Sequence, residues 1–236
     1  PSTSMFFPKR LQGTALGIQA GIGNFGVSVA QFMTPAMLGI ATYGAAQVFS
    51  KTDPNTKEVI STSEIYLQSA AFWYVPLLVI LALASWWIIR SVPVKASLRE
   101  QMDIFKSKHT WFCTITYIMT FGGFSGLAAI FPLMIKTVYG DFPNAPDPLK
   151  YAFLGPLIGA GIRVLFGFVA DRVGGAVLTT ITGIALIIGC ISLVQLDLLT
   201  PSSLEQFPMF LYLMLALFFF TGIGNAATFR QFPVIF

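Results

Sequence analysis

Charged residues are scarce in this chain. They make up 10% of its 236 residues, whereas an ordinary soluble domain carries about 25%. Hydrophobic residues make up 55%, and they lie in blocks of about 20, the length that a helix needs to cross roughly 30 Å of hydrocarbon. No ten-residue stretch alternates polar and apolar residues as a transmembrane barrel strand does. The composition excludes most soluble folds and predicts an all-α membrane protein embedded in a lipid bilayer.

Residues for metal binding and covalent catalysis are also few: the chain has two cysteines and one histidine. Cys113 and Cys190 lie in separate apolar runs, which excludes a disulfide framework and a four-ligand metal site. With the interfacial His109 they provide neither a nucleophile with its base nor a metal cluster. We therefore expect no enzymatic activity and no cofactor. The net charge of +4 does not indicate nucleic acid, because the basic residues are spread over the ends of hydrophobic segments.

Six apolar segments are long enough to span a bilayer as helices. They are predicted at Thr14–Thr42, Ala71–Ile89, Thr110–Lys136, Tyr151–Ala170, Ala176–Val194 and Phe207–Phe229. Residues 1–8 resemble the tail of an earlier helix. Since the chain opens without an initiator methionine and stops within an apolar run, we expect an internal fragment of a longer membrane protein.

Lysine and arginine in the connections predict the orientation, because cytoplasmic loops hold an excess of them. One set of connections carries Lys9, Arg10, Arg90, Lys95, Arg99, Lys106, Lys108, Arg172 and Arg230. The opposite set carries most of the acids. We expect a multi-pass protein of the cell (inner) membrane with both chain ends in the cytoplasm. The long basic connection 90–109 is predicted to link two bundles, 1–89 and 110–236.

Arg163 is the one charged residue predicted near the middle of a span. Arginine keeps its proton, and placing it at a helix centre costs about 2.5–3.5 kcal/mol on insertion scales. No aspartate or glutamate lies within the spans, and Asp171 falls two turns away at a helix end. These facts favour a dissolved anion that enters a water-filled cavity as the partner. Backbone carbonyls of a broken helix, or helices outside the chain, are the alternative.

Two further patterns could line such a cavity. Tyr117 and Phe121 are four residues apart and share a helix face, although aromatic residues at this spacing mostly serve packing. The first span carries a stripe of small and polar residues: Gly17, Gly21, Asn24, Ser28, Gln31 and Pro35. Such a face either packs closely on another helix or lines a transport path. The sixth span repeats a short motif of the first: Gly-Ile-Gly-Asn occurs at 222–225 and at 21–24.

The stretch Gly167-x-x-x-Asp171-Arg172-x-Gly174 resembles the loop signature of the major facilitator superfamily. An acid and a base meet there at a helix end, where a charge pair can hold neighbouring helices in one conformational state; an ordinary surface turn is the alternative. The resemblance implies a two-bundle transporter, of which this chain would hold the tail of helix 4 and helices 5 to 10.

Two stretches resemble the nitrate/nitrite porters within that superfamily. Residues 15–28 are similar to the first nitrate signature on their helix five, and residues 151–175 are similar to their helix eight. The resemblance implies nitrate and nitrite as substrates. It also implies a substrate site containing Arg163, Tyr117 and Phe121, with Gly21 and Asn24 from the signature. The signature's frequent asparagine-glycine is replaced by Gln19-Ala20, so that asparagine contact is not carried over.

The resemblance places the rest of the site, an arginine on helix two and a second signature on helix eleven, outside this chain. We expect alternating access by a monomer. The lack of an acid within the spans favours nitrate/nitrite antiport over proton-coupled nitrate symport. A transporter of another small anion and a membrane-embedded nitrate sensor are the competing hypotheses.

Overall fold

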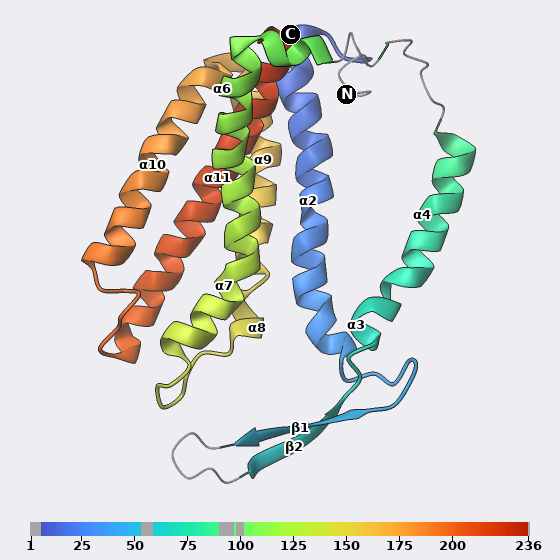
Figure 1. The fold of residues 1–236 in the computed structure, drawn as a ribbon, viewed down its shortest axis with the longest axis vertical. Coiled ribbons are helices and arrows are strands. Elements are labelled where there is room, and N and C mark those ends of the chain that lie inside the picture. The colour runs from blue at the N-terminus through green and yellow to red at the C-terminus, as the bar shows by residue number, and fades with distance from the viewer. Residues whose placement is uncertain (1–5, 53–58, 90–96, 98–101, 236) are drawn as a thin grey trace. The chain divides into compact units, whose positions relative to one another are not determined.

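The structure is a computed structural model that describes residues 6–52, 59–89, 97 and 102–235 (Figure 1). The chain divides into two compact units, one of Pro1–Val29 with Lys95–Phe236 and the other of Ala30–Val94. The boundary at Val29 falls inside α2 (Gln12–Met37). The first unit therefore contains the start of α2 together with the whole second half of the chain.

The first unit is a bundle of long helices. In Figure 1 its helices run side by side, and α11 packs against both α9 and α10. The elements in chain order are η1 (Lys9–Leu11), the start of α2, η2 (Asp103–Lys106), α6 (Lys108–Tyr117), η3 (Ile118–Gly122), α7 (Gly123–Tyr139), α8 (Pro148–Tyr151), α9 (Leu154–Val173), α10 (Gly175–Gln195), η4 (Leu204–Gln206) and α11 (Phe207–Ile235). The π-helical turn η3 joins α6 and α7 into one rod.

Local sequence explains where these helices begin and end. The Asp147 side chain accepts a hydrogen bond from the backbone N–H of Leu149 and so caps α8. Ser203 and Gln206 form a capping box ahead of α11. Gly174 separates α9 from α10 with φ of 97°, a left-handed conformation that only glycine adopts without strain.

Five stretches among the described residues are long and apolar enough to cross a membrane. They are Ser69–Ile88, Lys108–Tyr139, Pro148–Val173, Gly175–Gln195 and Leu204–Ile235, which match five of the six predicted spans. The sixth, α2, has sufficient length at 26 residues. The small and polar residues of its stripe keep the mean hydropathy of α2 below that of the other spans.

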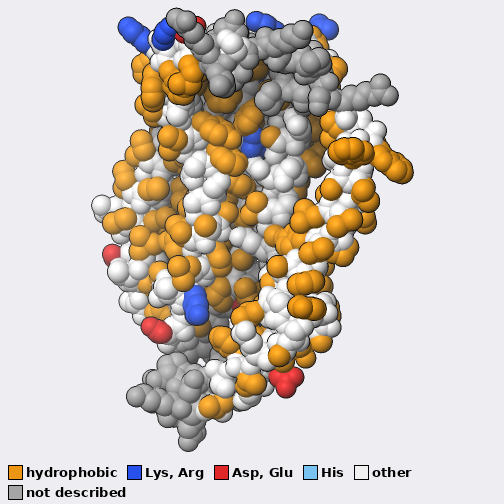
Figure 2. All heavy atoms as spheres, turned by 45° about the vertical axis from the view of Figure 1, so that its right-hand side comes forward, with side chains coloured by type: hydrophobic (Ala, Val, Ile, Leu, Met, Phe, Trp, Pro, Cys, Tyr) orange, Lys and Arg blue, Asp and Glu red, His pale blue; other side chains and the backbone are white. Residues whose placement is uncertain are grey.

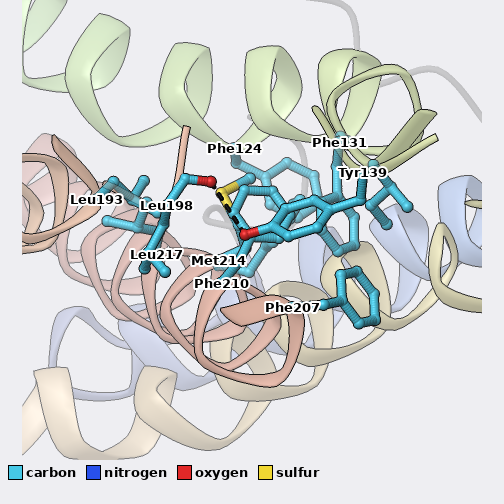
Figure 3. Close-up of a cluster of buried hydrophobic side chains, with 12 residues drawn as sticks. Phe124, Phe131, Tyr139, Leu193, Leu198, Phe207, Phe210, Met214 and Leu217 are labelled. Atoms are coloured by element: carbon cyan, nitrogen blue, oxygen red, sulfur yellow. Dashed lines mark hydrogen bonds between the residues drawn. The ribbon is translucent and has the colours of Figure 1, made fainter. Parts of the chain in front are cut away.

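A core of aromatic and aliphatic side chains holds α7 to α11 (Figure 3). Phe131, Ile135 and Tyr139 of α7 are fully buried against Phe210, Met214 and Phe218 of α11. The Tyr139 hydroxyl donates to the backbone oxygen of Leu198 at 3.1 Å (Figure 3), so its one polar group is satisfied inside the cluster. Elsewhere the helices expose apolar side chains, and Figure 2 shows hydrophobic groups over most of the visible helical surface. Such a surface suits lipid rather than water.

The second unit contains the end of α2, a β-hairpin and the rod α3–α4. Strands β1 (Gln47–Thr52) and β2 (Val59–Ile65) pair antiparallel, with Gln47 opposite Ile65. The hairpin was not predicted, because a short pair of strands inside a polar connection gives no long apolar run. The Ser69 hydroxyl donates to the Ile40 carbonyl at 2.7 Å and so fixes the start of α3 (Ser69–Phe72). The following α4 (Tyr74–Ile88) buries none of its residues.

Most of the predicted linker 90–109 lies outside the described residues, which omit 90–96 and 98–101. Its described end contains η2 and the first residues of α6. The predicted bundle boundary at 110 falls two residues after α6 begins at Lys108.

Candidate functional site

Glycines bring α2 against α9 along three turns. A Cβ at Gly17 would lie 3.0 Å from Gly167 Cα, and one at Gly21 would lie 2.5 Å from a methyl group of Val164. Ser28 continues this face and donates to the Phe153 carbonyl at 2.9 Å. The small and polar stripe of α2 therefore packs on α9 over this stretch, as close-packing glycine faces do in membranes. Gly21 serves this contact.

A second close contact between glycines brings α11 against α9 at Gly159. A Cβ at Gly222 would lie 2.5 Å from the Gly159 carbonyl oxygen, which leaves no room for a side chain. The two Gly-Ile-Gly-Asn repeats thus each pack a glycine on α9, Gly21 by Ala160 and Val164 and Gly222 by Gly159. Both contacts fall within about one turn of Arg163.

Arg163 is buried in the middle of α9, with 2% of the residue exposed. It lies nine residues from Leu154 and ten from Val173, or about 14 Å from either end at 1.5 Å per residue. Among the described residues no acid and no carbonyl contacts its guanidinium, and its Nε is buried without a partner. Its Cζ lies 4.5 Å from the ring centre of Phe229, a cation–π contact.

Phe229 joins Arg163 to the predicted aromatic pair. Tyr117 and Phe121 stack with centroids 5.1 Å apart and an interplanar angle of 3°. The Phe229 ring meets Tyr117 edge to face at 5.8 Å. The structure therefore brings Arg163, Tyr117 and Phe121 into one aromatic-lined region through a residue that the sequence analysis did not select.

Two asparagines carry polar atoms that are buried without a hydrogen bond to the described residues. Asn24 is half-buried, and its Nδ2 is buried without a hydrogen bond to the described residues. Asn225 is 1% exposed, and its Oδ1 is likewise buried and unpaired. The sequence analysis selected Asn24 alone. The repeat at 222–225 was the signal that could have pointed to Asn225.

A charged junction lies at the end of α9. The Asp171 carboxylate accepts hydrogen bonds from the backbone N–H groups of Gly13 at 2.9 Å and Thr14 at 2.7 Å, and from the Thr14 hydroxyl at 2.7 Å. It also pairs with Arg230 Nε of α11 at 2.8 Å, and only 7% of the Asp171 side chain is exposed. One carboxylate therefore ties together α2, α9 and α11 by charge-assisted hydrogen bonds.

The ion pair of Asp171 is with Arg230 and not with its sequence neighbour Arg172. Arg172 is exposed and holds its guanidinium 4.1 Å from the ring centre of Phe168. Adjacent residues of a helix point about 100° apart, so Asp171 and Arg172 cannot face the same neighbour. The two glycines of the motif have separate uses: Gly167 packs on Gly13 and Gly17 of α2, and Gly174 makes the left-handed turn between α9 and α10.

A comparison with known families fits this helical architecture. The sequence model of the Major Facilitator Superfamily matches residues 1–235. The chain belongs to this superfamily. The all-α membrane fold predicted from the sequence is thereby confirmed, and the protein is a multi-pass membrane protein.

Named relatives are similar over the whole chain. A protein named probable nitrate/nitrite antiporter NarK2, from Thermus thermophilus, is 54% identical over 100% of this chain and 52% of its own length. The nitrate/nitrite transporters NarU of Salmonella typhimurium and Escherichia coli are each 35% identical over 99% of this chain and 48% of their own length. The resemblance to nitrate/nitrite porters is thus confirmed as a similarity. The chain spans about half the length of these curated relatives.

Proposed function

We propose that the protein transports nitrate and nitrite across the cell (inner) membrane by alternating access, as an antiporter. Its chain would supply helices 5 and 6 within residues 1–89, a cytoplasmic linker at 90–109 and helices 7 to 10 within 110–236. The substrate would contact Arg163, Tyr117 and Phe121, with Gly21 and Asn24 beside them. Superfamily membership and the names of the relatives support this proposal.

Arg163 is the observation that carries the proposal. Its guanidinium is buried at the centre of α9 and contacts no acid among the described residues. A permanent positive charge in the bilayer core needs a counter-charge. A fixed carboxylate would neutralise it permanently, whereas a diffusible anion neutralises it only while bound. The unpaired guanidinium of Arg163 therefore suits an anion that binds reversibly.

The surroundings favour a small, planar oxyanion. The N–H groups of a guanidinium radiate in its own plane and can donate two roughly parallel hydrogen bonds to two oxygens of one anion. Contact with the Phe229 ring does not consume those donors. The stacked pair Tyr117 and Phe121 offers a flat aromatic surface near Phe229. Nitrate and nitrite match a site with a charged fork and flat walls.

Burial of the charge also explains exchange. The substrate offsets the cost of holding Arg163 in the bilayer core, so the loaded and the empty protein differ in how readily the bundles rock. Among the described residues no acid pairs with Arg163: Asp171 stands near the end of α9, and Glu64 lies in strand β2. This placement favours nitrate/nitrite antiport over proton-coupled symport, in which an acid commonly carries the proton.

The substitution Arg163→Lys tests the assignment, because lysine keeps the charge and loses the fork. We expect the variant of the intact protein to insert normally and to lose uptake of labelled nitrate into proteoliposomes that contain nitrite. Arg10→Lys, at an exposed arginine of η1, is the matched control and keeps uptake. Near-normal uptake by Arg163→Lys would contradict the assignment.

The same vesicles separate the competing hypotheses. Antiport predicts that nitrate uptake needs nitrite or nitrate inside and is insensitive to an imposed pH gradient. A proton symporter would respond to the gradient with no anion inside. Counterflow driven by phosphate or a carboxylate, but not by nitrite, would indicate a transporter of another anion.

A further inference from the structure

One face of α11 is turned toward α9 along two helical turns. Gly222, Asn225 and Phe229 are spaced i, i+3 and i+7, and residues at this spacing share a helix face. The first of them touches the α9 backbone at Gly159, and the last carries the Arg163 guanidinium on its ring at 4.5 Å. Asn225 lies between these two contacts and therefore faces α9 beside Arg163.

Asn225 and Arg163 carry complementary polar atoms that lack partners. Asn225 Oδ1 can only accept a hydrogen bond, and Arg163 Nε–H can only donate one. Both atoms are buried and make no hydrogen bond to the described residues, and the residues are 1% and 2% exposed. An unsatisfied polar atom in a bilayer core costs several kcal/mol. The acceptor of Asn225 and the donor of Arg163 have the chemistry to satisfy one another.

We propose that Asn225 is a positioning residue for Arg163: its carboxamide oxygen accepts the Nε–H of the guanidinium when the guanidinium holds a small oxyanion. This role rests on the proposed function, since it presumes that Arg163 binds the substrate. The hydrogen bond fixes the rotation of the guanidinium about its long axis. Both terminal nitrogens then point toward the anion as a fork.

The uncharged nature of Asn225 is essential to this role. A carboxamide oxygen satisfies Nε–H without neutralising the guanidinium, so the full positive charge stays available to the substrate. A carboxylate at the same position would form a permanent buried ion pair with Arg163 and would compete with the anion. The asparagine thus provides orientation and leaves the charge to the substrate.

Two variants of the intact protein separate these effects. Asn225→Leu has a similar size and removes the acceptor, and Asn225→Asp keeps the shape and adds a charge. Thr221→Val is the control: Thr221 is equally buried on α11, and its hydroxyl donates to the Phe218 carbonyl within its own helix. Purified proteins are titrated with sodium nitrate, and the thermal midpoint is followed with and without the anion, because a ligand that binds the folded state raises it.

We expect Asn225→Leu to bind nitrate about tenfold more weakly, as the loss of one hydrogen bond to a charged group predicts. We expect Asn225→Asp to keep or raise its midpoint without nitrate, because the new ion pair is satisfied, and to lose the nitrate-dependent rise. Thr221→Val keeps the affinity within about twofold. A purely structural role would lower the midpoint of both Asn225 variants and leave the nitrate-dependent rise in place.

The outcomes distinguish this role from the proposed function. Absence of any nitrate-dependent rise in the wild-type protein and in Thr221→Val would refute the proposed function and the role of Asn225 with it. A rise in the wild-type protein that persists unchanged in Asn225→Asp and Asn225→Leu would refute the role of Asn225 alone.

Discussion

The hydrogen bonds and the ion pair of Asp171 hold α2 against α9, and we expect their loss to loosen this contact. In Asp171→Asn the shape is kept and the charge is lost. An amide group would replace the carboxylate oxygen that now accepts from the N–H and the hydroxyl of Thr14, each at 2.7 Å. It would place a donor opposite the Thr14 backbone donor. The charge of Arg230, now 2.8 Å from Asp171, would lose its counter-charge.

The burial of Asp171 and Arg230 sets the free-energy cost of the Asp171→Asn substitution. Only 7% of the Asp171 side chain and 17% of the Arg230 side chain are exposed, so solvent screens the pair little. Breaking a buried pair by removing one partner costs about 3–5 kcal/mol. At about 1.4 kcal/mol per factor of ten, even the lower figure shifts the balance between joined and separated helices by about 100-fold. Partial compensation by the remaining oxygen leaves at least about a tenfold shift.

Cysteine labelling measures this shift. Leu16 of α2 is 7% exposed, so a cysteine at Leu16, with Cys113 and Cys190 replaced by alanine, reacts with a maleimide only when its surroundings open. We expect Asp171→Asn to raise the labelling rate of Leu16→Cys at least about tenfold, and Arg230→Gln to raise it less, because Asp171 keeps its hydrogen bonds to α2. Arg172→Gln, at the exposed neighbour, leaves the rate unchanged. Equal rates in Asp171→Asn and Arg172→Gln would refute the reasoning.

Two further predictions concern α11. Phe229→Leu removes the cation–π contact that holds the Arg163 guanidinium in place. Because such a contact is worth about 0.5–2 kcal/mol, we expect nitrate binding to weaken by at most about 30-fold in a calorimetric titration, and an unchanged affinity would show that the ring does not position Arg163. Gly222→Ala would place a Cβ 2.5 Å from the Gly159 carbonyl, whereas Gly126→Ala on α7 meets no atom within 4 Å. The first should therefore lower the yield of monodisperse protein on size-exclusion chromatography, and the second should not.

The sequence predicts the helices better than it predicts their contacts. Length and apolar content place the spans, since the bilayer leaves few other structures for a chain of this composition. The stripe of α2 allowed two uses, close packing or lining a transport path, and the structure shows its glycines Gly17 and Gly21 packed on α9. The hairpin β1–β2 was not predicted, because its strands lie in a polar connection and are stabilised by pairing rather than by an apolar run.

The sequence reveals a site residue when its type is unusual for a membrane span. It does not reveal a site residue whose type is common in such spans. A charged Arg163 amid apolar residues is visible from sequence alone. Phe229 is not, since one phenylalanine among 23 differs from the others only by the ring's position over the guanidinium. The partner of Asp171 was equally hidden: Arg172 is adjacent in sequence, but Arg230 is adjacent in space. Contacts between distant segments need the helix packing, which the sequence pattern does not specify.

Helix α9 carries both the buried charge of Arg163 and the Asp171 junction with α2 and α11. Its central residue Arg163 carries the charge, and Asp171 lies eight residues further along, or about 12 Å. The start of α2 contacts α9 at both levels, through Gly21 beside Val164 and through Gly13 and Thr14 on Asp171. Both contacts lie on one continuous helix, because α2 runs from Gln12 to Met37 without a break. No loop therefore separates the contact beside Arg163 from the Asp171 junction.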